Sequence, residues 1–264
     1  MYVVAIAELN EAIDIEAVAL ASDLGVTVYE ARRLLAPGIP AVVLTTLDKP
    51  KALELLARLR TRGHGAIACD AAAVAPSRDM TLMRRFRLGQ DGISLDDVPG
   101  AHLPYDDALV LVAAVHRRRT ANEGEVHDRK LSVARAVLSG GLVMTRTVKR
   151  ETHAAEDERE PVLYLFRRSG GAPWILREHG THWVGLGRPV APSAADNFRA
   201  SLQVLRERMP GAVYDDRLVA RRFAPERLAV SGGSAGTTVT TSSEGGIDLL
   251  AHLLALWIAR TAPP

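Results

Sequence analysis

Residues 48–63 read DKPKALELLARLRTRG and contain the clearest helix pattern in the chain. Apolar side chains recur there at helical spacing, with Lys51, Glu54 and Arg58 on the opposite side. Gly63 is a common residue just beyond the end of a helix. We therefore expect an amphipathic helix from Asp48 to Arg62, and its buried stripe consists of Ala52, Leu55, Leu56 and Leu59.

Short strands and helices surround this helix. Thr27 precedes Glu30 by three residues, which is the spacing of a capping box and marks the start of a helix. Pro37-Gly38 ends that helix. The pattern also predicts a strand at 2–7, a helix at 14–24, a strand at 41–44 and a strand at 64–69. Residues 1–75 are thus predicted to form a small α+β domain with the order β-α-α-β-α-β.

Three stretches of this segment carry a family resemblance: Leu24-Gly25, Tyr29 to Leu35, and Lys51-Ala52-Leu53 through Arg62-Gly63. They resemble the C-terminal domain of the bacterial ribosomal stalk protein, whose fold is shared by ClpS, the adaptor of the Clp protease. The resemblance covers about residues 1–72 and implies this fold and the use of an exposed helix to dock other proteins.

The first helix departs from the stalk family. In that family the helix presents lysines that dock translation factors, whereas Asp14, Glu16 and Asp23 make it acidic here. We therefore expect the chain not to co-sediment with ribosomes, although a translation-associated role stays an alternative.

A weakly patterned stretch around Pro76 and Ser77 marks the expected end of this domain. Residues 80–220 then carry short strand patterns followed by an amphipathic helix at 193–209, and the acidic residues 153–160 are expected in an exposed loop. The expected strands lie at 82–88, 108–118, 142–150, 162–168 and 173–178. This mainly antiparallel sheet or barrel, closed by a helix, weakly resembles the pleckstrin-homology arrangement.

The remaining chain has two parts. Residues 231–246 are rich in Gly, Ser and Thr, a composition typical of a flexible linker. Residues 247–260 form a predicted helix that is apolar almost all round and therefore needs a covering surface. That surface belongs to its own chain, to a second copy or to a partner's groove. The side chains proposed for association are Ile247, Leu250, Leu254, Trp257 and Ile258.

Composition limits the classes of partner. The chain has 264 residues with 33 basic and 31 acidic side chains, so its net charge of +2 indicates no basic footprint over the whole surface. A nucleic-acid partner is not expected. The single cysteine, Cys69, cannot form an internal disulfide, and we find no secretion signal and no apolar run long enough for a membrane span. A cytoplasmic location is expected.

One local charge cluster is a candidate for binding an anion or a partner. It consists of Arg84, Arg85, Arg87, Arg117, Arg118 and Arg119. If the two strands that carry these arginines are neighbours, the side chains form a patch for phosphate, a phospholipid headgroup or nucleic acid. The alternative is that they are solvated, with Asp91, Asp96 and Asp97 close in sequence to neutralise them.

The sequence contains only weak motifs for metal binding, catalysis or nucleotide binding. His179 and His182 have only Glu178 nearby as a further ligand, and zinc needs three or four. Cys69 has the pattern of a buried core residue, and the paired aspartates fit turns. These pairs are Asp96-Asp97, Asp106-Asp107 and Asp215-Asp216. The glycine-rich stretches lack the lysine of a phosphate-binding loop. We predict no catalytic, cofactor-binding or metal-binding residue.

These observations favour a non-enzymatic adaptor that binds a protein partner or itself. The alternative from another class is a metal-dependent or other hydrolase that uses His179, His182 and acids of the sheet. Burial of those side chains in one cleft, with strongly shifted pKa values, would favour the hydrolase.

Overall fold

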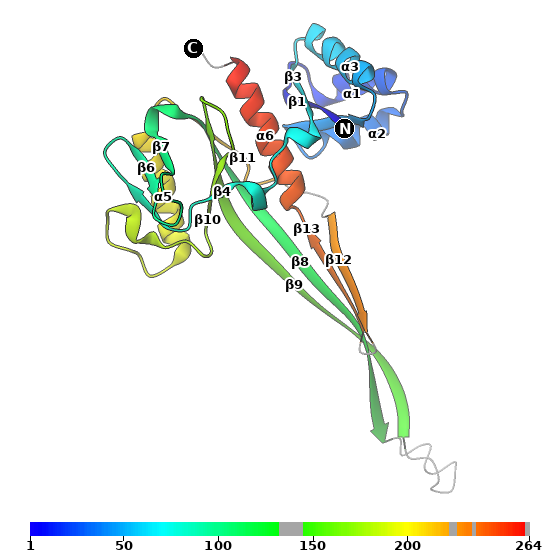
Figure 1. Cartoon of the computed structure of the whole chain (residues 1–264). Coiled ribbons are helices and arrows are strands. Elements are labelled where there is room, and N and C mark those ends of the chain that lie inside the picture. The colour runs from blue at the N-terminus through cyan, green and yellow to red at the C-terminus, as the bar shows by residue number, and fades with distance from the viewer. Residues whose placement is uncertain (132–144, 222–225, 234–235, 262–264) are drawn as a thin grey trace, which may run out of the picture. The chain divides into compact units, whose positions relative to one another are not determined.

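The structure is a computed structural model of an α+β chain (Figure 1). It describes the backbone of residues 1–131, 145–221, 226–233 and 236–261, and the side chains of residues 1–120, 157–221 and 240–261. The chain divides into two compact units. The first contains residues 1–116, 160–224 and 244–264, and the second contains residues 117–159 and 225–243.

The N-terminal part of the first unit has the predicted order of elements. These are β1 (Tyr2–Glu8), α1 (Ile13–Leu24), α2 (Val28–Leu35), β2 (Ala41–Thr46), α3 (Lys49–Thr61) and β3 (Gly65–Asp70). The three strands form one antiparallel sheet in the order β2-β1-β3. One face of this sheet packs against the three helices through a core that includes Val4, Ile6, Leu20, Leu35 and Leu59.

Local side-chain hydrogen bonds explain where two of these helices begin. The Thr27 hydroxyl oxygen accepts from the Glu30 amide at 3.2 Å, and the Thr27 amide donates to the Glu30 carboxylate at 2.8 Å. At the start of α3, the Asp48 carboxylate accepts from the Lys51 amide at 3.0 Å. Both contacts satisfy backbone N–H groups that the first helical turn leaves unpaired, so the sequence signals for these two helices are confirmed.

The rest of the first unit is rich in strands. Its elements are β4 (Thr81–Leu82), β5 (Phe86–Leu88), β6 (Gly92–Leu95), β7 (His102–Pro104), the long strands β8 (Ala108–Leu131) and β9 (Thr145–Arg167), which continue into the second unit, β10 (Trp174–Arg177), α5 (Ala194–Arg208) and β11 (Val213–Leu218). β5, β6 and β7 form a small antiparallel sheet. The larger sheet has the order β12-β13-β8-β9-β10-β4, and β11 also pairs with β8. The pairings β9–β10, β12–β13 and β13–β8 are antiparallel, whereas β10–β4 and β11–β8 are parallel, so the expectation of a mainly antiparallel sheet is confirmed.

Helix α5 closes one face of this part, as the sequence predicts. Ser193 caps its start by accepting from the Asp196 amide at 3.0 Å, and Met209 is its C-cap. Phe198, Leu205 and Met209 are buried in the cluster that also contains strand residues of β5 to β10. The expected helix at 193–209 therefore agrees with the structure to within its two caps.

Strands β12 (Glu226–Gly233) and β13 (Gly236–Ser242) form a hairpin in the second unit, and β13 pairs with β8 from Thr237↔Glu123 to Ser242↔Arg118. The prediction of a flexible linker at 231–246 is therefore wrong. Residues 237–241 are Thr-Thr-Val-Thr-Thr, and these β-branched residues favour strands despite the glycines around them. Residues 153–160 also belong to a strand, β9, rather than to a loop. Of the expected strand 142–150, residues 142–144 lie outside the described residues.

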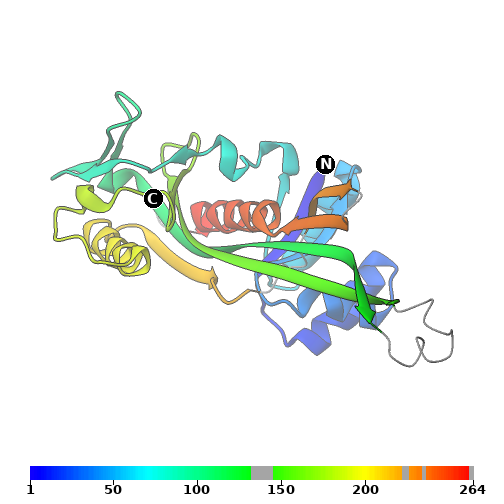
Figure 2. The same cartoon turned by 90° about the horizontal axis from the view of Figure 1, so that it is seen from below.

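Helix α6 (Glu244–Thr261) follows directly, three residues earlier than expected. It packs against the N-terminal sheet and the larger sheet within the first unit, as the red helix in Figures 1 and 2 shows. One continuous core joins Val3, Ala5 and Ile67 of the N-terminal sheet, Val112 and Ile175 of the larger sheet, and the helix. None of the described helices is long and apolar enough to span a bilayer.

Candidate functional site

The proposed association helix is covered by its own chain. Ile247, Leu250, Leu254 and Ile258 are buried in the core between the two sheets, and Trp257 is half-buried. A Cβ atom on Gly65 would lie 2.7 Å from the Trp257 ring, so a glycine on β3 leaves the space that the ring fills. The prediction that these five side chains form a docking element is wrong, because they already pack within the first unit.

A buried polar network holds α6 in this position. The carboxylate of Asp248 accepts hydrogen bonds from the Ser77 amide at 2.7 Å, from the Ser77 hydroxyl and from the Tyr164 hydroxyl at 2.6 Å. His116 Nε2 lies 2.6 Å from the Tyr164 oxygen. Because Tyr164 donates to the carboxylate, its oxygen can accept a hydrogen bond from Nε2–H of a neutral His116. The network therefore joins α6 to strands β8 and β9 and to the turn before β4.

Burial shifts the pKa values in this network. It lowers the pKa of His116 to about 4, although Glu244 and Asp248 oppose the shift. It also raises the pKa of Tyr164 well above the usual value, and the charge of Asp248 adds to this. Shifted pKa values can mark an active site, but here the Ser77 hydroxyl donates to a carboxylate rather than to an imidazole. All four side chains are buried, so we interpret the network as structural.

The six arginines of the predicted patch do not lie on neighbouring strands. Arg87 belongs to β5 in the small sheet, and Arg84 and Arg85 directly precede that strand. Arg117 to Arg119 lie on β8 of the larger sheet, in the second unit. The prediction of one arginine patch required these two strands to be neighbours, and it is therefore wrong. Arg87 is also paired with Asp96, at 2.5 Å between the two charged groups. This agrees with the alternative that nearby aspartates neutralise the arginines.

The hydrolase alternative depends on His179 and His182. His179 and His182 are exposed. Within the described part of the chain, no group of three or more His, Cys, Asp and Glu side chains could hold a metal ion. Burial raises the pKa of the Cys69 thiol, which keeps it protonated and weakly nucleophilic. Of the paired acids, Asp107 accepts from Ser169 and Asp215 pairs with Arg217, which are structural contacts.

The acidic residues of α1 have a role that sequence reasoning missed. Glu16 is 1% exposed, and its carboxylate contacts Arg62 at 2.7 Å and His64 at 2.6 Å. Asp23 pairs with Arg58 at 2.9 Å and with Arg62 at 2.7 Å. Two of the three acids in this helix therefore face α3 rather than solvent. The signal was present in the sequence as the arginines that end the α3 pattern.

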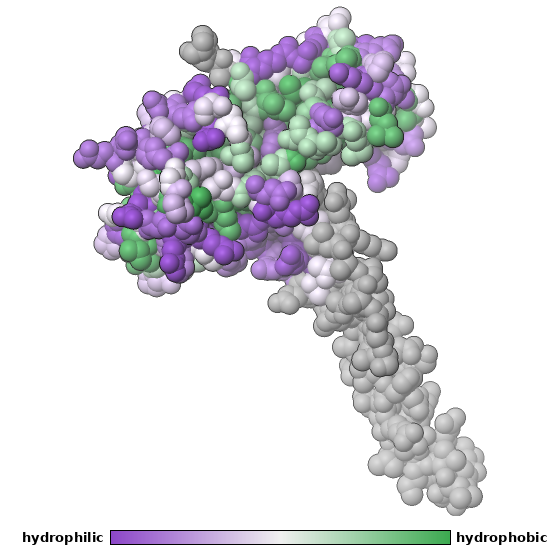
Figure 3. Space-filling view, viewed as in Figure 1, coloured by the Kyte–Doolittle hydropathy of each residue, from purple (hydrophilic) through white to green (hydrophobic). Residues whose placement is uncertain are grey.

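Exposed apolar side chains lie on both α1 and α2. Ile15 and Val18 of α1 are 61% and 58% exposed, and Tyr29 of α2 is 69% exposed. An ion pair of 3.0 Å between Asp14 and Arg32 joins the start of α1 to the end of α2, so the two helices run antiparallel and bring these side chains to one surface. Figure 3 shows strongly apolar side chains at the edge of the N-terminal sheet and helices. We call Ile15, Val18 and Tyr29 the α1–α2 face.

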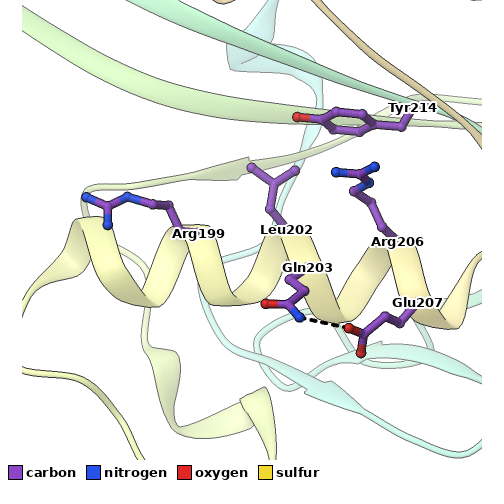
Figure 4. A pocket seen from close by; sticks show the side chains of 6 residues that line it. All are labelled: Arg199, Leu202, Gln203, Arg206, Glu207 and Tyr214. Carbon is purple, nitrogen blue, oxygen red and sulfur yellow. Dashed lines mark hydrogen bonds between the residues drawn. The ribbon is translucent and has the colours of Figure 1, made fainter.

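A second surface feature is a hollow between α5 and β11. It is lined by Arg199, Leu202, Gln203, Arg206, Glu207 and Tyr214, which Figure 4 shows. The guanidinium of Arg206 lies over the Tyr214 ring, 4.2 Å from its centroid. Burial raises the pKa of Tyr214, so its hydroxyl stays protonated at neutral pH. The hollow thus presents a cation, an aromatic ring and an aliphatic side chain, which suits binding rather than covalent chemistry.

Comparisons with models of protein families, with curated proteins and with solved structures find no match to this chain.

Proposed function

We propose that this protein is a non-enzymatic adaptor that binds a partner protein through the α1–α2 face. The observation that carries the proposal is the exposure of Ile15, Val18 and Tyr29 on two adjacent helices. Aliphatic and aromatic side chains gathered on one surface favour protein association, because covering them removes apolar area from water. The resemblance to the stalk and Clp-adaptor domains supports the same use of an exposed helix.

The charged side chains near the α1–α2 face are already paired with one another, which favours an apolar contact with a partner. Glu16 is paired with Arg62 and Asp23 with Arg58. Asp14 is paired with Arg32. The partner then meets apolar side chains whose neighbouring charges are already compensated, so little charge is desolvated on binding. In this proposal the protein acts in the cytoplasm, where Cys69 stays reduced.

The test compares three forms of the full chain in cells that produce it. One is the native chain, one carries Ile15→Asp with Val18→Asp, and one carries Leu47→Asp as a control. Leu47 is 83% exposed and apolar, and it lies in the same domain outside the proposed face. Each form is cross-linked and purified, and its partners are compared by quantitative mass spectrometry.

We expect one partner that the native chain and the Leu47→Asp control retain and that the double variant loses. With that partner purified, the double substitution is expected to weaken the dissociation constant at least about ten-fold. Equal partners for all three forms would contradict the proposal. Co-sedimentation of the native chain with ribosomes would favour the translation-associated alternative, which uses the same face.

A further inference from the structure

Arg206 is a cation without a counterion among the described side chains. It makes no hydrogen bond or ion pair with them, and its guanidinium is held over the Tyr214 ring. A guanidinium that is already ordered by stacking loses less conformational freedom when it binds a carboxylate or phosphate. Arg206 is therefore prepared to bind an oxyanion.

The rest of the hollow favours a ligand with several groups over a single small ion. Arg199 precedes Arg206 by seven residues, which places their backbones about 10 Å apart along the helix. Figure 4 shows that Arg199 points away from Arg206, that Arg206 points to the Tyr214 ring, and that Leu202 lies between the two arginines. One phosphate could not contact both guanidinium groups. A ligand with two anionic groups on either side of an apolar group fits this arrangement.

Acidic side chains near the hollow leave Arg206 as the main anchor. Arg199 donates to Asp196 at 2.8 Å, so part of its charge is compensated. Glu207 accepts from the Gln203 amide at 3.0 Å, which holds its carboxylate on the side of the helix away from Tyr214, as Figure 4 shows. An incoming carboxylate therefore meets Arg206 first, while Arg199 adds a weaker second contact.

We propose that this hollow binds an acidic segment of a partner protein, with carboxylates flanking an apolar side chain. A helix with Glu at two positions seven residues apart and Leu between them repeats the spacing of Arg199, Leu202 and Arg206 with opposite charge. This surface is independent of the α1–α2 face. Together they would let one chain connect two proteins.

The test measures binding of a labelled helical peptide to the full chain by fluorescence anisotropy. The peptide carries Glu at positions i and i+7 and Leu at i+3, and a second peptide has Gln in place of both Glu residues. The variants are Arg206→Gln, Tyr214→Leu and Arg188→Gln. Arg188 is an exposed arginine outside the hollow and serves as the matched control. The unfolding midpoint of each variant checks that it is folded.

We expect Arg206→Gln to weaken binding of the Glu peptide about ten-fold, and Tyr214→Leu to weaken it by a smaller factor because the cation remains but is less ordered. Arg188→Gln and the native chain are expected to bind alike, and the Gln peptide is expected to bind more weakly. Equal loss in Arg188→Gln, or equal binding of both peptides, would overturn the proposal. So would inorganic phosphate that displaces the peptide at equal concentration, since it would show a simple oxyanion site.

Discussion

Helix α1 exposes Ile15 and Val18 and buries the carboxylate of Glu16, whereas helix α6 buries apolar side chains on nearly every side. Both helices are rich in apolar residues, and both bury one acid. The acid of α1 is held by the cation Arg62 and by His64. The acid of α6, Asp248, is held by uncharged hydroxyl and amide donors.

The difference between the two helices lies in what covers them. Two sheets cover α6, so its apolar surface stabilises the fold. Helix α1 rests on the core through Ala17, Leu20 and Ala21 and leaves its other side uncovered. Apolar content alone therefore does not identify a docking helix, and the substitutions below test which helix stabilises the fold and which is available to a partner.

Substitution at the centre of α6 is expected to destabilise the fold most. Leu254 is fully buried between the two sheets, so Leu254→Ala removes apolar contacts on both sides and leaves a cavity. We expect the free energy of unfolding to fall by about 3 kcal/mol, measured by urea denaturation. Leu256 is 43% exposed on the same helix, and Leu256→Ala is the control, with an expected loss below about 1 kcal/mol. Equal losses would show that α6 is not held between the sheets.

Removing the buried carboxylate of Glu16 in α1 is expected to lower the free energy of unfolding by a similar or slightly smaller amount. Glu16→Ala leaves Arg62 and His64 without their carboxylate partner, and we expect a loss of about 3 kcal/mol or slightly less, because Arg62 retains some access to water. Glu54 also contacts an arginine, Arg58, but its side chain is 63% exposed. Glu54→Ala is therefore expected to cost below about 0.5 kcal/mol in the same denaturation experiment. A small loss for both variants would contradict the structural role of Glu16.

Much of the fold was predictable from local signals, and the candidate surfaces were not. The capping box at Thr27, the stripe of α3 and the limits of α5 each depend on residues within one or two turns. The linker prediction failed because pairing of residues 237–242 with the distant strand β8 outweighs their composition. Likewise, the covering of α6 depends on residues of β1 and β3 that are far away in sequence. The Arg206–Tyr214 contact joins two elements whose pairing no local pattern indicates.

The network that holds α6 gives a dependence of stability on pH. Burial lowers the pKa of His116 to about 4 in the folded chain, against about 6.5 when unfolded. The unfolded chain therefore binds the proton more readily, and stability is retained above about pH 6.5 and lost as the pH falls toward 4. Between pH 7 and about pH 4.5 we expect His116 to account for a loss of about 2 kcal/mol.

The control for this dependence is His116→Gln, because Gln keeps a donor for Tyr164 and does not titrate. Burial also lowers the pKa of His252, which adds a loss of the same sign that the variant retains. Urea denaturation of both proteins at the two pH values separates the contributions. The same pH dependence in both would refute the assignment to His116.

We expect exposed side chains of the α1–α2 face to contribute least to stability. Ile15→Ala removes an exposed side chain, so we expect the free energy of unfolding to change by less than about 0.5 kcal/mol in the same denaturation experiment. Leu20→Ala, on the buried side of the same helix, is expected to cost about 3 kcal/mol. An isoleucine that stabilises neither its own helix nor the core is free to contribute its apolar area to a partner. If Ile15→Ala is as costly as Leu20→Ala, the side chain is part of the fold and the α1–α2 face loses its main docking residue.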